Sequence, residues 1–157
     1  EKWYNENNVI IDGSHLIDGK PKPNVKYKSG EYNYIYETDE FGNISRVYVE
    51  ELKHTERKYR KRHKQNTFDK QVGDHAGHLI ADRFGGSAEL DNLVSQSALV
   101  NLSEYKKLEN IWDRAIKKGK KVSFDIQVKY DGNSRRPSEF IVEYKVDSII
   151  YKRNINN

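Results

Sequence analysis

Two segments near the end of the chain carry an apolar residue at every second position, and this period of two constrains the fold more than any other feature. Every even-numbered residue from Val122 to Tyr130 is apolar or aromatic, and the same holds from Phe140 to Val146. Successive side chains of a strand point to opposite faces, so each segment is expected to be a strand with one buried face. The polar link DGNSRRPS between them predicts an antiparallel hairpin.

The rest of the pattern indicates a mixed α+β fold built around an antiparallel sheet. The segments 32–38 (YNYIYET) and 44–50 (ISRVYVE) flank DEFGN and predict a second hairpin. Apolar residues recur at helical spacing from Tyr105 to Ile116, with Ser103 as the expected N-cap and Gly119 as the stop, so we predict a helix over about 103–118. Residues 148–157 are compatible with a last strand or a frayed tail.

The length of 157 residues suits one main domain with a single core. Residues 1–30 hold two of the three prolines together with several Asn, Gly and Lys. They are expected to form an N-terminal arm or linker with a short strand at Asn8–Ile11, which leaves 31–157 as the main domain. The chain begins at Glu1 rather than Met, so we expect it to be part of a longer protein.

Composition excludes several classes of function. The chain has no cysteine, which rules out disulfides, thiol chemistry and zinc fingers. No apolar run approaches the roughly 18 residues of a membrane span, and residues 1–20 lack the apolar core of a signal peptide. The net charge of +4 and the isoelectric point of about 9.1 favour a polyanionic partner.

The basic character is concentrated in the segment 53–65 (KHTERKYRKRHKQ), where seven of 13 residues are Lys or Arg and two are His. One interpretation is a solvated basic face. The other is a loop or short helix that grips phosphate groups and releases their counterions on binding.

The stretch GDHAGHLIADRFGG, residues 73–86, holds the strongest candidate for chemistry. Hydrolysis of a phosphodiester needs an activated water, and a histidine such as His78, with a pKa near neutral, can take its proton. Further along the chain follow Asn92 within LDNL, then Asn101, then Glu109 inside the predicted helix.

This order of residues resembles the ββα-metal (His-Me finger) nuclease superfamily. The pattern GHLIADRFGG…LDNL…N is similar to the His-Asn-His endonucleases, whereas AGH followed by N-x7-E is similar to the DNA/RNA non-specific endonucleases, whose motif is Asp-Arg-Gly-His. With DRFGGS, YKKLEN, GKKV and RPSEF added, residues 35–147 resemble the nuclease toxin domain at the C-terminus of Gram-positive type VII secreted toxins. The resemblance implies a ββα finger and a nuclease domain over 31–157.

The chain departs from the Asp-Arg-Gly-His motif at one place. Ala76 occupies the Arg position, and His75 stands where the Asp is expected. An arginine that steadies the substrate phosphate must therefore come from elsewhere, with Arg83 and Arg136 as candidates. For Arg83, an ion pair within the protein is an equally open interpretation.

The resemblance implies roles for the remaining residues. Asn101 would hold one divalent cation, most favourably Mg²⁺, with Mn²⁺ as the alternative. Glu109 would orient a metal-bound water, because eight helical residues rise about 12 Å and keep its carboxylate from binding the same ion directly. One alternative is that Asn101 lies on a curved segment before the helix, which would bring the two side chains closer. The other is that Glu109 is a surface residue paired with Lys106 or Arg114. Independently of the resemblance, Asn92 is expected to support the loop by bonding backbone groups. His75 would support the same loop as a helper of the site, with a surface role as the equally open alternative.

The expected function is a metal-dependent, sequence-non-specific endonuclease that acts on DNA, with RNA as a second substrate, and leaves 5′-phosphate products. By the same resemblance the full protein would be a secreted antibacterial toxin that acts in the cytoplasm of a target cell and is neutralised by a cognate immunity protein. The alternatives are a basic nucleic-acid-binding domain without catalysis and a metal-independent ribonuclease toxin. His15, His54 and His63 are expected to be exposed and uninvolved, and a zinc site at His75 and His78 lacks further ligands.

Overall fold

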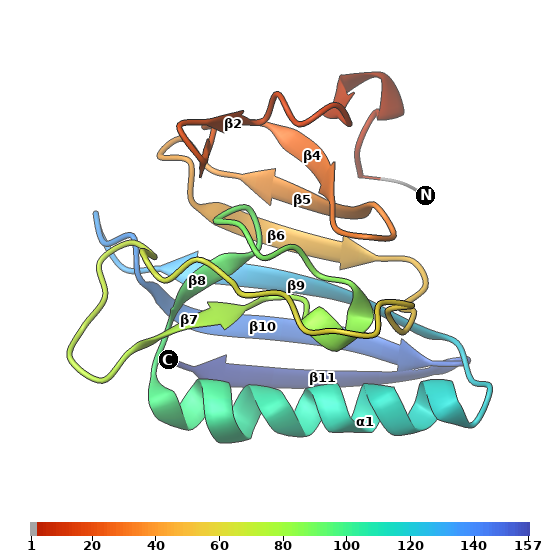
Figure 1. The fold of residues 1–157 in the computed structure, drawn as a ribbon. Helices are drawn as coiled ribbons and strands as arrows, with labels where there is room; N and C mark the ends of the chain where they lie inside the picture. Colours follow the sequence, from red (N-terminus) through yellow and green to blue (C-terminus); the bar gives the residue numbers. More distant parts are fainter. Residues whose placement is uncertain (1–2) are drawn as a thin grey trace.

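A seven-stranded sheet forms the frame of the computed structural model, which describes residues 3–157 (Figure 1). Its strands lie in the order β1-β4-β5-β6-β9-β10-β11, and all neighbours are antiparallel except β1 and β4. The strands are β1 (Val9–Ile10), β4 (Lys26–Ser29), β5 (Tyr34–Thr38), β6 (Ile44–Val49), β9 (Val122–Tyr130), β10 (Pro137–Val146) and β11 (Ile149–Asn156). Two short strands, β2 (Leu16–Ile17) and β3 (Lys20–Pro21), pair apart from this sheet.

Both predicted hairpins are confirmed. β5 pairs with β6, and β9 pairs with β10 in a register that sets Ile126 opposite Val142. The even-numbered residues of β9 from Val122 to Val128 are buried, as the alternation requires. The last segment is a strand, β11, rather than a frayed tail.

A smaller hairpin lies in front of the sheet and leads into the helix (Figure 1). It consists of β7 (His75–His78) and β8 (Leu93–Gln96), and it is followed by the π-helical segment Val100–Glu104 and by α1 (Tyr105–Lys117). This strand–strand–helix unit matches the expected ββα finger within a mixed α+β fold. No helix in the part of the chain that the structure describes has the length and apolar composition needed to cross a bilayer.

The helix begins earlier than predicted, and Ser103 is not its cap. Helical residues start at Ala98, and the hydroxyl of Ser97 accepts a hydrogen bond from Val100 N at 3.2 Å. A π-helical turn replaces regular α geometry over Val100–Glu104, so the apolar period read from α1 does not extend back through it. Asn101 therefore lies inside the helix rather than before it.

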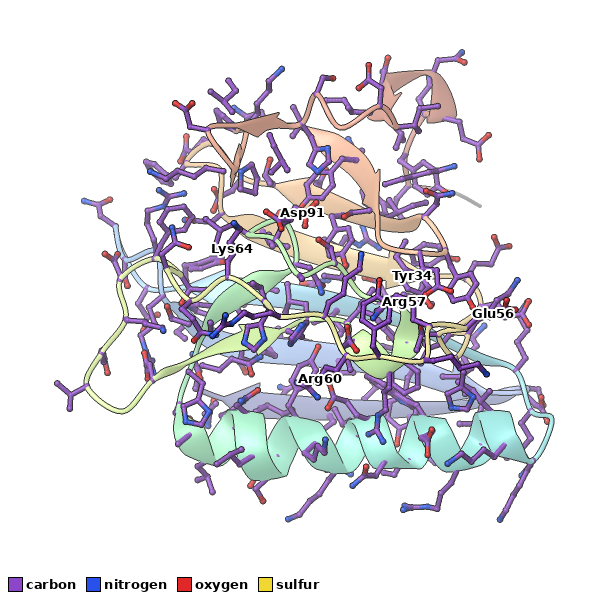
Figure 2. All side chains as sticks on the ribbon, viewed as in Figure 1. Tyr34, Glu56, Arg57, Arg60, Lys64 and Asp91 are labelled. Atoms are coloured by element: carbon purple, nitrogen blue, oxygen red, sulfur yellow. The ribbon has the colours of Figure 1, made fainter. Side chains whose placement is uncertain are left out.

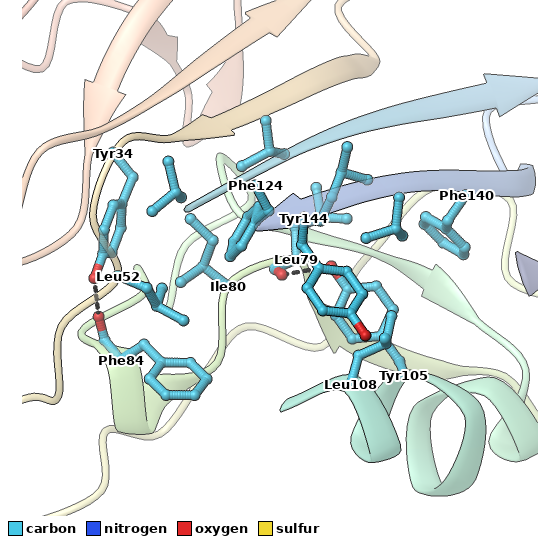
Figure 3. Close-up of a cluster of buried hydrophobic side chains, with 14 of the residues drawn as sticks. Tyr34, Leu52, Leu79, Ile80, Phe84, Tyr105, Leu108, Phe124, Phe140 and Tyr144 are labelled. Carbon is cyan, nitrogen blue, oxygen red and sulfur yellow. Dashed lines mark hydrogen bonds between the residues drawn. The ribbon is translucent and has the colours of Figure 1, made fainter. Parts of the chain in front are cut away.

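The core lies between the sheet and the layer formed by the finger (Figure 3). Trp112 of α1 stacks on Phe124 of β9 with ring centroids 4.5 Å apart and meets Tyr144 of β10 edge-on. Tyr105 is buried at the start of α1 and donates a hydrogen bond to Leu79 O at 2.6 Å. Since each large buried side chain is worth roughly 1.5–3 kcal/mol, these contacts hold the helix and the strand β7 in one fixed relation.

The loosely packed arm expected for residues 1–30 is, over its described part, an ordered edge of the structure. β1 and β4 extend the main sheet, and Tyr27 of β4 is fully buried. His15, expected to be exposed, is buried, and its Nε2 lies 2.8 Å from Asp91 Oδ2. Burial of apolar side chains such as Val9 and Tyr27 outweighs the turn-forming composition of this segment.

Candidate active site

His78 lies at the end of β7, where the hairpin leads into the Leu79–Gly86 loop. It pairs across the hairpin with Leu93 and is 9% exposed. Its Nε2 is buried and makes no hydrogen bond with any described residue. A buried polar atom without a partner costs free energy in the folded state, which makes His78 a candidate for contact with a ligand.

Asn101 and Glu109 lie on the same side of the helix because of the π-helical turn. In a regular α-helix eight residues advance about 2.2 turns, which would set the two side chains about 80° apart. A π-helical turn takes up one extra residue, so the interval becomes close to two turns. Both residues line one cavity, about two helical turns from each other along the axis.

This cavity, here called the catalytic pocket after the role proposed for it, has a volume of about 200 Å³ and brings the predicted His78, Asn101, Glu109 and Arg83 together. Its lining comprises Arg60, His78, Ala81, Asp82, Arg83, Asn101, Leu102, Lys106 and Glu109. Three cationic side chains and two carboxylates thus surround one imidazole and one amide. Such a composition suits an anionic ligand with a polar reacting centre.

Burial shifts the pKa values of His78 and Glu109, which both line the pocket, in opposite directions. It lowers the pKa of His78 to about 4, and the positive charges of His63 and Arg60 act in the same direction. It raises the pKa of Glu109 to about 7, against the opposing effect of Arg83, Lys106 and Arg60. At neutral pH the imidazole is therefore unprotonated, the state that a general base requires.

Two residues next to His78 come from the basic segment 53–65, which crosses the face of the finger as an irregular loop (Figure 2). The ring of His63 lies 4.6 Å from the ring of His78, and burial lowers the pKa of His63. Arg60 lines the catalytic pocket and forms no ion pair within the described residues. The expectation that His63 is exposed was wrong, because it is partly buried against His78. Arg60 could have been found only as one of seven basic residues in the segment.

His54, also expected to be exposed, is partly buried. Its Nε2 lies 2.5 Å from Asp113 Oδ1, and its ring stacks on Phe84. It does not line the catalytic pocket. The contact therefore attaches the start of the basic segment to α1.

Asn92 is fully buried and holds the loop that follows His78. Its Nδ2 donates to Ile80 O and to Ser87 O, both at 2.8 Å, and its Oδ1 accepts from Ile80 N and from the hydroxyl of Tyr36. Gly86 allows this close packing, because a Cβ there would lie 1.8 Å from Ile80 O. The loop after His78 is thus fixed by one side chain and one glycine.

The two arginines proposed for the substrate phosphate lie in different places. Arg83 lines the catalytic pocket, yet its Nη2 donates to Asn110 Oδ1 at 2.8 Å and its Nη1 is 4.0 Å from Asp113. Arg136 is outside the pocket, where its guanidinium binds both carboxylate oxygens of Asp74, at 2.7 and 3.0 Å. The neighbouring Arg135 stacks over Phe68, 3.6 Å from the ring centroid.

A divalent cation would find one amide oxygen here rather than a dense set of protein ligands. Among the described residues, no three His, Cys, Asp or Glu side chains are grouped to hold a metal ion. Asn101 Nδ2 lies 2.9 Å from His75 Nδ1, so the amide donates to the unprotonated ring nitrogen and its Oδ1 is not used in this contact. This donor set fits an ion that keeps most of its waters and binds the substrate, as Mg²⁺ does.

Comparison with known proteins identifies the family. The family model described as DNA/RNA non-specific endonuclease matches residues 23–148. The "Type VII secretion system protein EssD" of Staphylococcus aureus strains USA300 and NCTC 8325 is 40% identical over 155 residues. The alignment covers 91% of this chain but only 24% of those proteins, so the chain spans about a quarter of their length. Endonucleases of this family hydrolyse nucleic acid and generally use a divalent metal ion. The chain belongs to the DNA/RNA non-specific endonuclease family.

Proposed function

We propose that this chain is a metal-dependent endonuclease that cleaves DNA, and RNA as a second substrate, with little sequence preference. The observation that carries this proposal is the meeting of His78, Asn101 and Glu109 in one small pocket beside the cations Arg60, Arg83 and Lys106. Contacts to phosphate carry no direct sequence information, so a site built from these cations reads the backbone rather than the bases.

His78 acts as the general base. Its neutral imidazole takes one proton from a water, and the resulting hydroxide attacks phosphorus while the bond from phosphorus to the 3′ oxygen breaks. The departing 3′ oxygen takes up a proton from a solvent water, and the imidazolium of His78 returns its proton to solvent, which leaves a 3′-hydroxyl and a 5′-phosphate. The negative charge of the bound phosphate favours the protonated imidazole and thereby raises the pKa of His78 during the reaction.

Asn101 would hold the metal ion through Oδ1, and the contact with His75 would fix the orientation of that amide. When bound, Mg²⁺ or Mn²⁺ supplies positive charge to the phosphate and to the departing oxygen. Glu109 is too far along the helix for the same direct contact, so its carboxylate orients water at the edge of the site. Arg83 contacts the phosphate if it releases Asn110, whereas Arg136 would first have to give up Asp74.

Nicking of supercoiled plasmid by the wild type and by His78→Ala, each with Mg²⁺ and with EDTA, tests the proposal. We expect the wild type to nick the plasmid in Mg²⁺ but not in EDTA. The products should be degraded by an exonuclease that requires a 5′-phosphate. Plasmid that stays intact at all protein concentrations while still being bound would identify a binding module instead. Cleavage of RNA in EDTA without action on DNA would identify a metal-independent ribonuclease.

The likeness to a type VII secretion protein supports a biological role for the full protein. We propose that it is exported, acts in the cytoplasm of a target bacterium, and is neutralised in the producer by an immunity protein with an acidic surface complementary to the basic segment 53–65. Expression of the wild-type chain in a bacterial cytoplasm should stop growth and degrade the chromosome, and His78→Ala should do neither.

A further inference from the structure

A second and larger cavity adjoins the catalytic pocket and shares Arg60 with it. This cavity, here called the 57–62 groove, has a volume of about 630 Å³. It is lined by Gly30, Glu31, Arg57, Tyr59, Arg60, Lys61, Arg62 and the segment 85–89. A nucleic-acid strand whose scissile phosphate lies in the catalytic pocket can continue past Arg60 into this groove.

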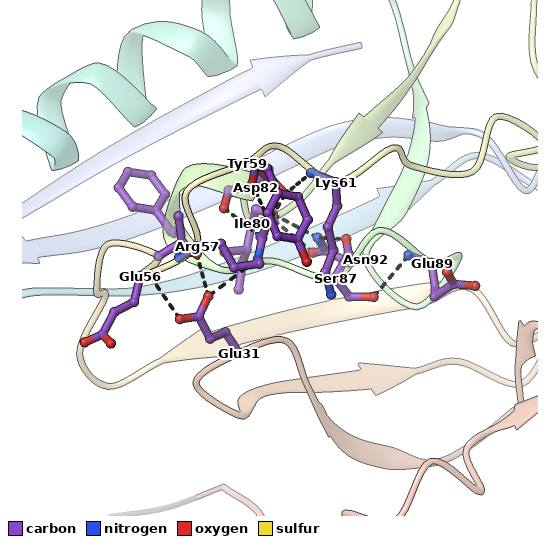
Figure 4. Close-up of polar contacts among 12 residues, drawn as sticks. Glu31, Glu56, Arg57, Tyr59, Lys61, Ile80, Asp82, Ser87, Glu89 and Asn92 are labelled. Carbon is purple, nitrogen blue, oxygen red and sulfur yellow. Dashed lines mark hydrogen bonds and ion pairs between the residues drawn. The ribbon is translucent and has the colours of Figure 1, made fainter.

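The groove has an excess of free positive charge. Arg60, Lys61 and Arg62 are exposed, and none of them forms an ion pair within the described residues. Glu31, on the opposite side, is bound by the hydroxyl of Thr55 and by Glu56 N and lies 3.8 Å from Arg57 (Figure 4). Three cationic side chains that form no ion pair with a described residue therefore line the groove. The carboxylate of Glu89 also lines it, and no cation among the described residues forms an ion pair with it.

Backbone rather than side chains forms one side of the groove. Gly30 has φ +86°, and a Cβ there would lie 2.8 Å from Gly85 O; Gly85 has φ +78°, and its Cβ would lie 2.8 Å from the side chain of Glu31. Larger residues at either position would be strained and would clash with the facing segment. The two glycines therefore allow the turns at Gly30 and Gly85 to approach each other closely along this side of the groove.

Tyr59 is the aromatic residue of this groove. It is 66% exposed, whereas Tyr27, Tyr34 and Tyr105 are buried in the core. Arg57 holds the backbone beside it, because Nη1 donates to Tyr59 O at 2.9 Å while Nη2 binds Asp82. Figure 4 shows Tyr59 between Arg57 and Lys61. An exposed aromatic ring among free cations is the combination that binds single-stranded nucleic acid through base stacking and phosphate contacts.

We propose that the 57–62 groove binds a single-stranded segment of the substrate next to the scissile phosphate, with Tyr59 stacked on a base and Arg60, Lys61 and Arg62 on the phosphates. This inference rests on the proposed nuclease function of the catalytic pocket. A duplex keeps its base faces stacked on one another, so Tyr59 favours single strands and unpaired regions. Every base has a face to stack on, so the groove adds a preference for strandedness without a preference for sequence.

Binding measurements test this inference separately from cleavage. Fluorescence anisotropy with labelled oligo-dT, oligo-U and a DNA duplex is measured in EDTA, with His78→Ala as the parent protein, so that no arm depends on catalysis. Tyr59→Ala should weaken binding of both single strands by about 5- to 150-fold, the range of one base–aromatic stack, and binding of the duplex by about 2-fold or less. Tyr59→Phe keeps the ring and should bind like the parent.

The matched control is Tyr151→Ala, which removes another exposed tyrosine from β11, outside the groove. It should leave all three affinities unchanged, and thermal unfolding should verify that each variant is folded. Equal losses on single strands and duplex, no loss with Tyr59→Ala, or a loss with Tyr59→Phe as large as with Tyr59→Ala would each overturn the role of Tyr59. If the His78→Ala parent cleaves plasmid like the wild type, the proposed function is contradicted. The binding result for Tyr59 would still hold, because it does not depend on cleavage.

Discussion

Two clusters, one around the buried His15 and one around the buried His78, contact the Leu79–Asn92 segment or adjoin it. They differ in how many of their buried polar atoms form hydrogen bonds. At the His15 cluster, Asp91 accepts hydrogen bonds from His15, Ser29 and Ser87 at 2.6–2.8 Å. His15 also stacks on Tyr27 with ring centroids 4.1 Å apart. His15 Nδ1 is buried and forms no hydrogen bond with any residue that the structure describes. The cluster joins the N-terminal segment to the loop and leaves little for a ligand to bind.

The His78 cluster has the opposite character. No described residue hydrogen-bonds to His78 Nε2, Arg60 has no ion pair, and these groups line a cavity together. A missing hydrogen bond is not sufficient by itself, because the amide of Gln96 is also buried without partners yet does not line the catalytic pocket. The comparison teaches that unsatisfied polar atoms identify a site when they are combined with a cavity and with uncommitted charge.

Replacing each of the two histidines by alanine tests the difference between the clusters and has the largest expected effect. His78→Ala should lower the rate of nicking by about 10²- to 10⁴-fold, the usual contribution of a general base. His15→Ala should instead lower the free energy of unfolding by about 1–3 kcal/mol, because Asp91 loses a buried partner. Its activity per folded molecule should stay at the wild-type level. Nicking rates and urea unfolding curves of both variants check the pair; a catalytic loss in His15→Ala equal to that in His78→Ala would contradict the division.

Asn92, which binds Ile80 and Ser87 within the loop that follows His78, should have the next largest effect. Asn92→Ala removes four hydrogen bonds and leaves buried groups of Ile80 and Ser87 unpaired, so stability should fall by about 3 kcal/mol. Urea unfolding measures the loss. Asn154→Ala on the exposed part of β11 is the matched control and should change stability by about 0.5 kcal/mol or less. Equal stabilities for the two variants would show that Asn92 does not hold the loop.

The pH dependence of stability sharpens the description of the catalytic pocket. The folded-state pKa of His78 is lowered to about 4, so its contribution to stability is complete above its unfolded pKa of about 6.5 and is lost as the pH falls toward 4. The pKa of Glu109 is raised to about 7, so its contribution is complete below about 4.5 and is lost as the pH rises toward 7. Each contribution amounts to about 3 kcal/mol.

The two contributions oppose each other in the wild type, and single variants separate them. Relative to the wild type, His78→Ala should gain stability as the pH falls from 6.5 to 4, whereas Glu109→Gln should gain stability as the pH rises from 4.5 to 7. Urea unfolding in EDTA at a series of pH values gives both curves. Other carboxylates contribute equally to all three proteins and cancel in the differences. Parallel curves for the three proteins would mean that neither group is buried as described.

Glu109→Gln should have the smallest effect on catalysis. A residue that acts by orienting water around a metal ion typically contributes about 10- to 100-fold. The loss should therefore be smaller than that of His78→Ala, and titration with Mg²⁺ should show whether it lies in metal affinity or in the rate at saturation. Glu104→Gln, which lies on the same helix but outside the pocket, is the control. A Glu109→Gln variant as active as the wild type at all Mg²⁺ concentrations would remove Glu109 from the site.

The parts of the fold that follow from a repeating pattern could be predicted from the sequence. The alternation over 122–146 gives the β9–β10 hairpin, and the helical spacing after Tyr105 gives α1. The start of the helix could not be predicted, because a π-helical turn obeys neither period. That same turn aligns Asn101 with Glu109, so the irregularity lies where the proposed chemistry lies.

Contacts between segments far apart in the sequence were the second part of the structure that could not be predicted. His15 meets Asp91 across 76 positions of the chain, and nothing in the local sequence of either residue indicates a partner. The basic segment has no regular secondary structure, so its path over the finger depends on tertiary contacts such as that of Arg57 with Asp82. The roles of His63 and Arg60 beside His78 therefore become visible only in three dimensions.

Chemical rescue tests whether the imidazole of His78 takes the proton of the attacking water. Nicking of supercoiled plasmid by His78→Ala is measured with Mg²⁺ at increasing concentrations of added imidazole, with Glu109→Gln as the comparison. The account predicts that neutral imidazole restores part of the activity of His78→Ala and leaves that of Glu109→Gln unchanged. A His78→Ala protein that nicks as fast as the wild type before any imidazole is added would contradict it.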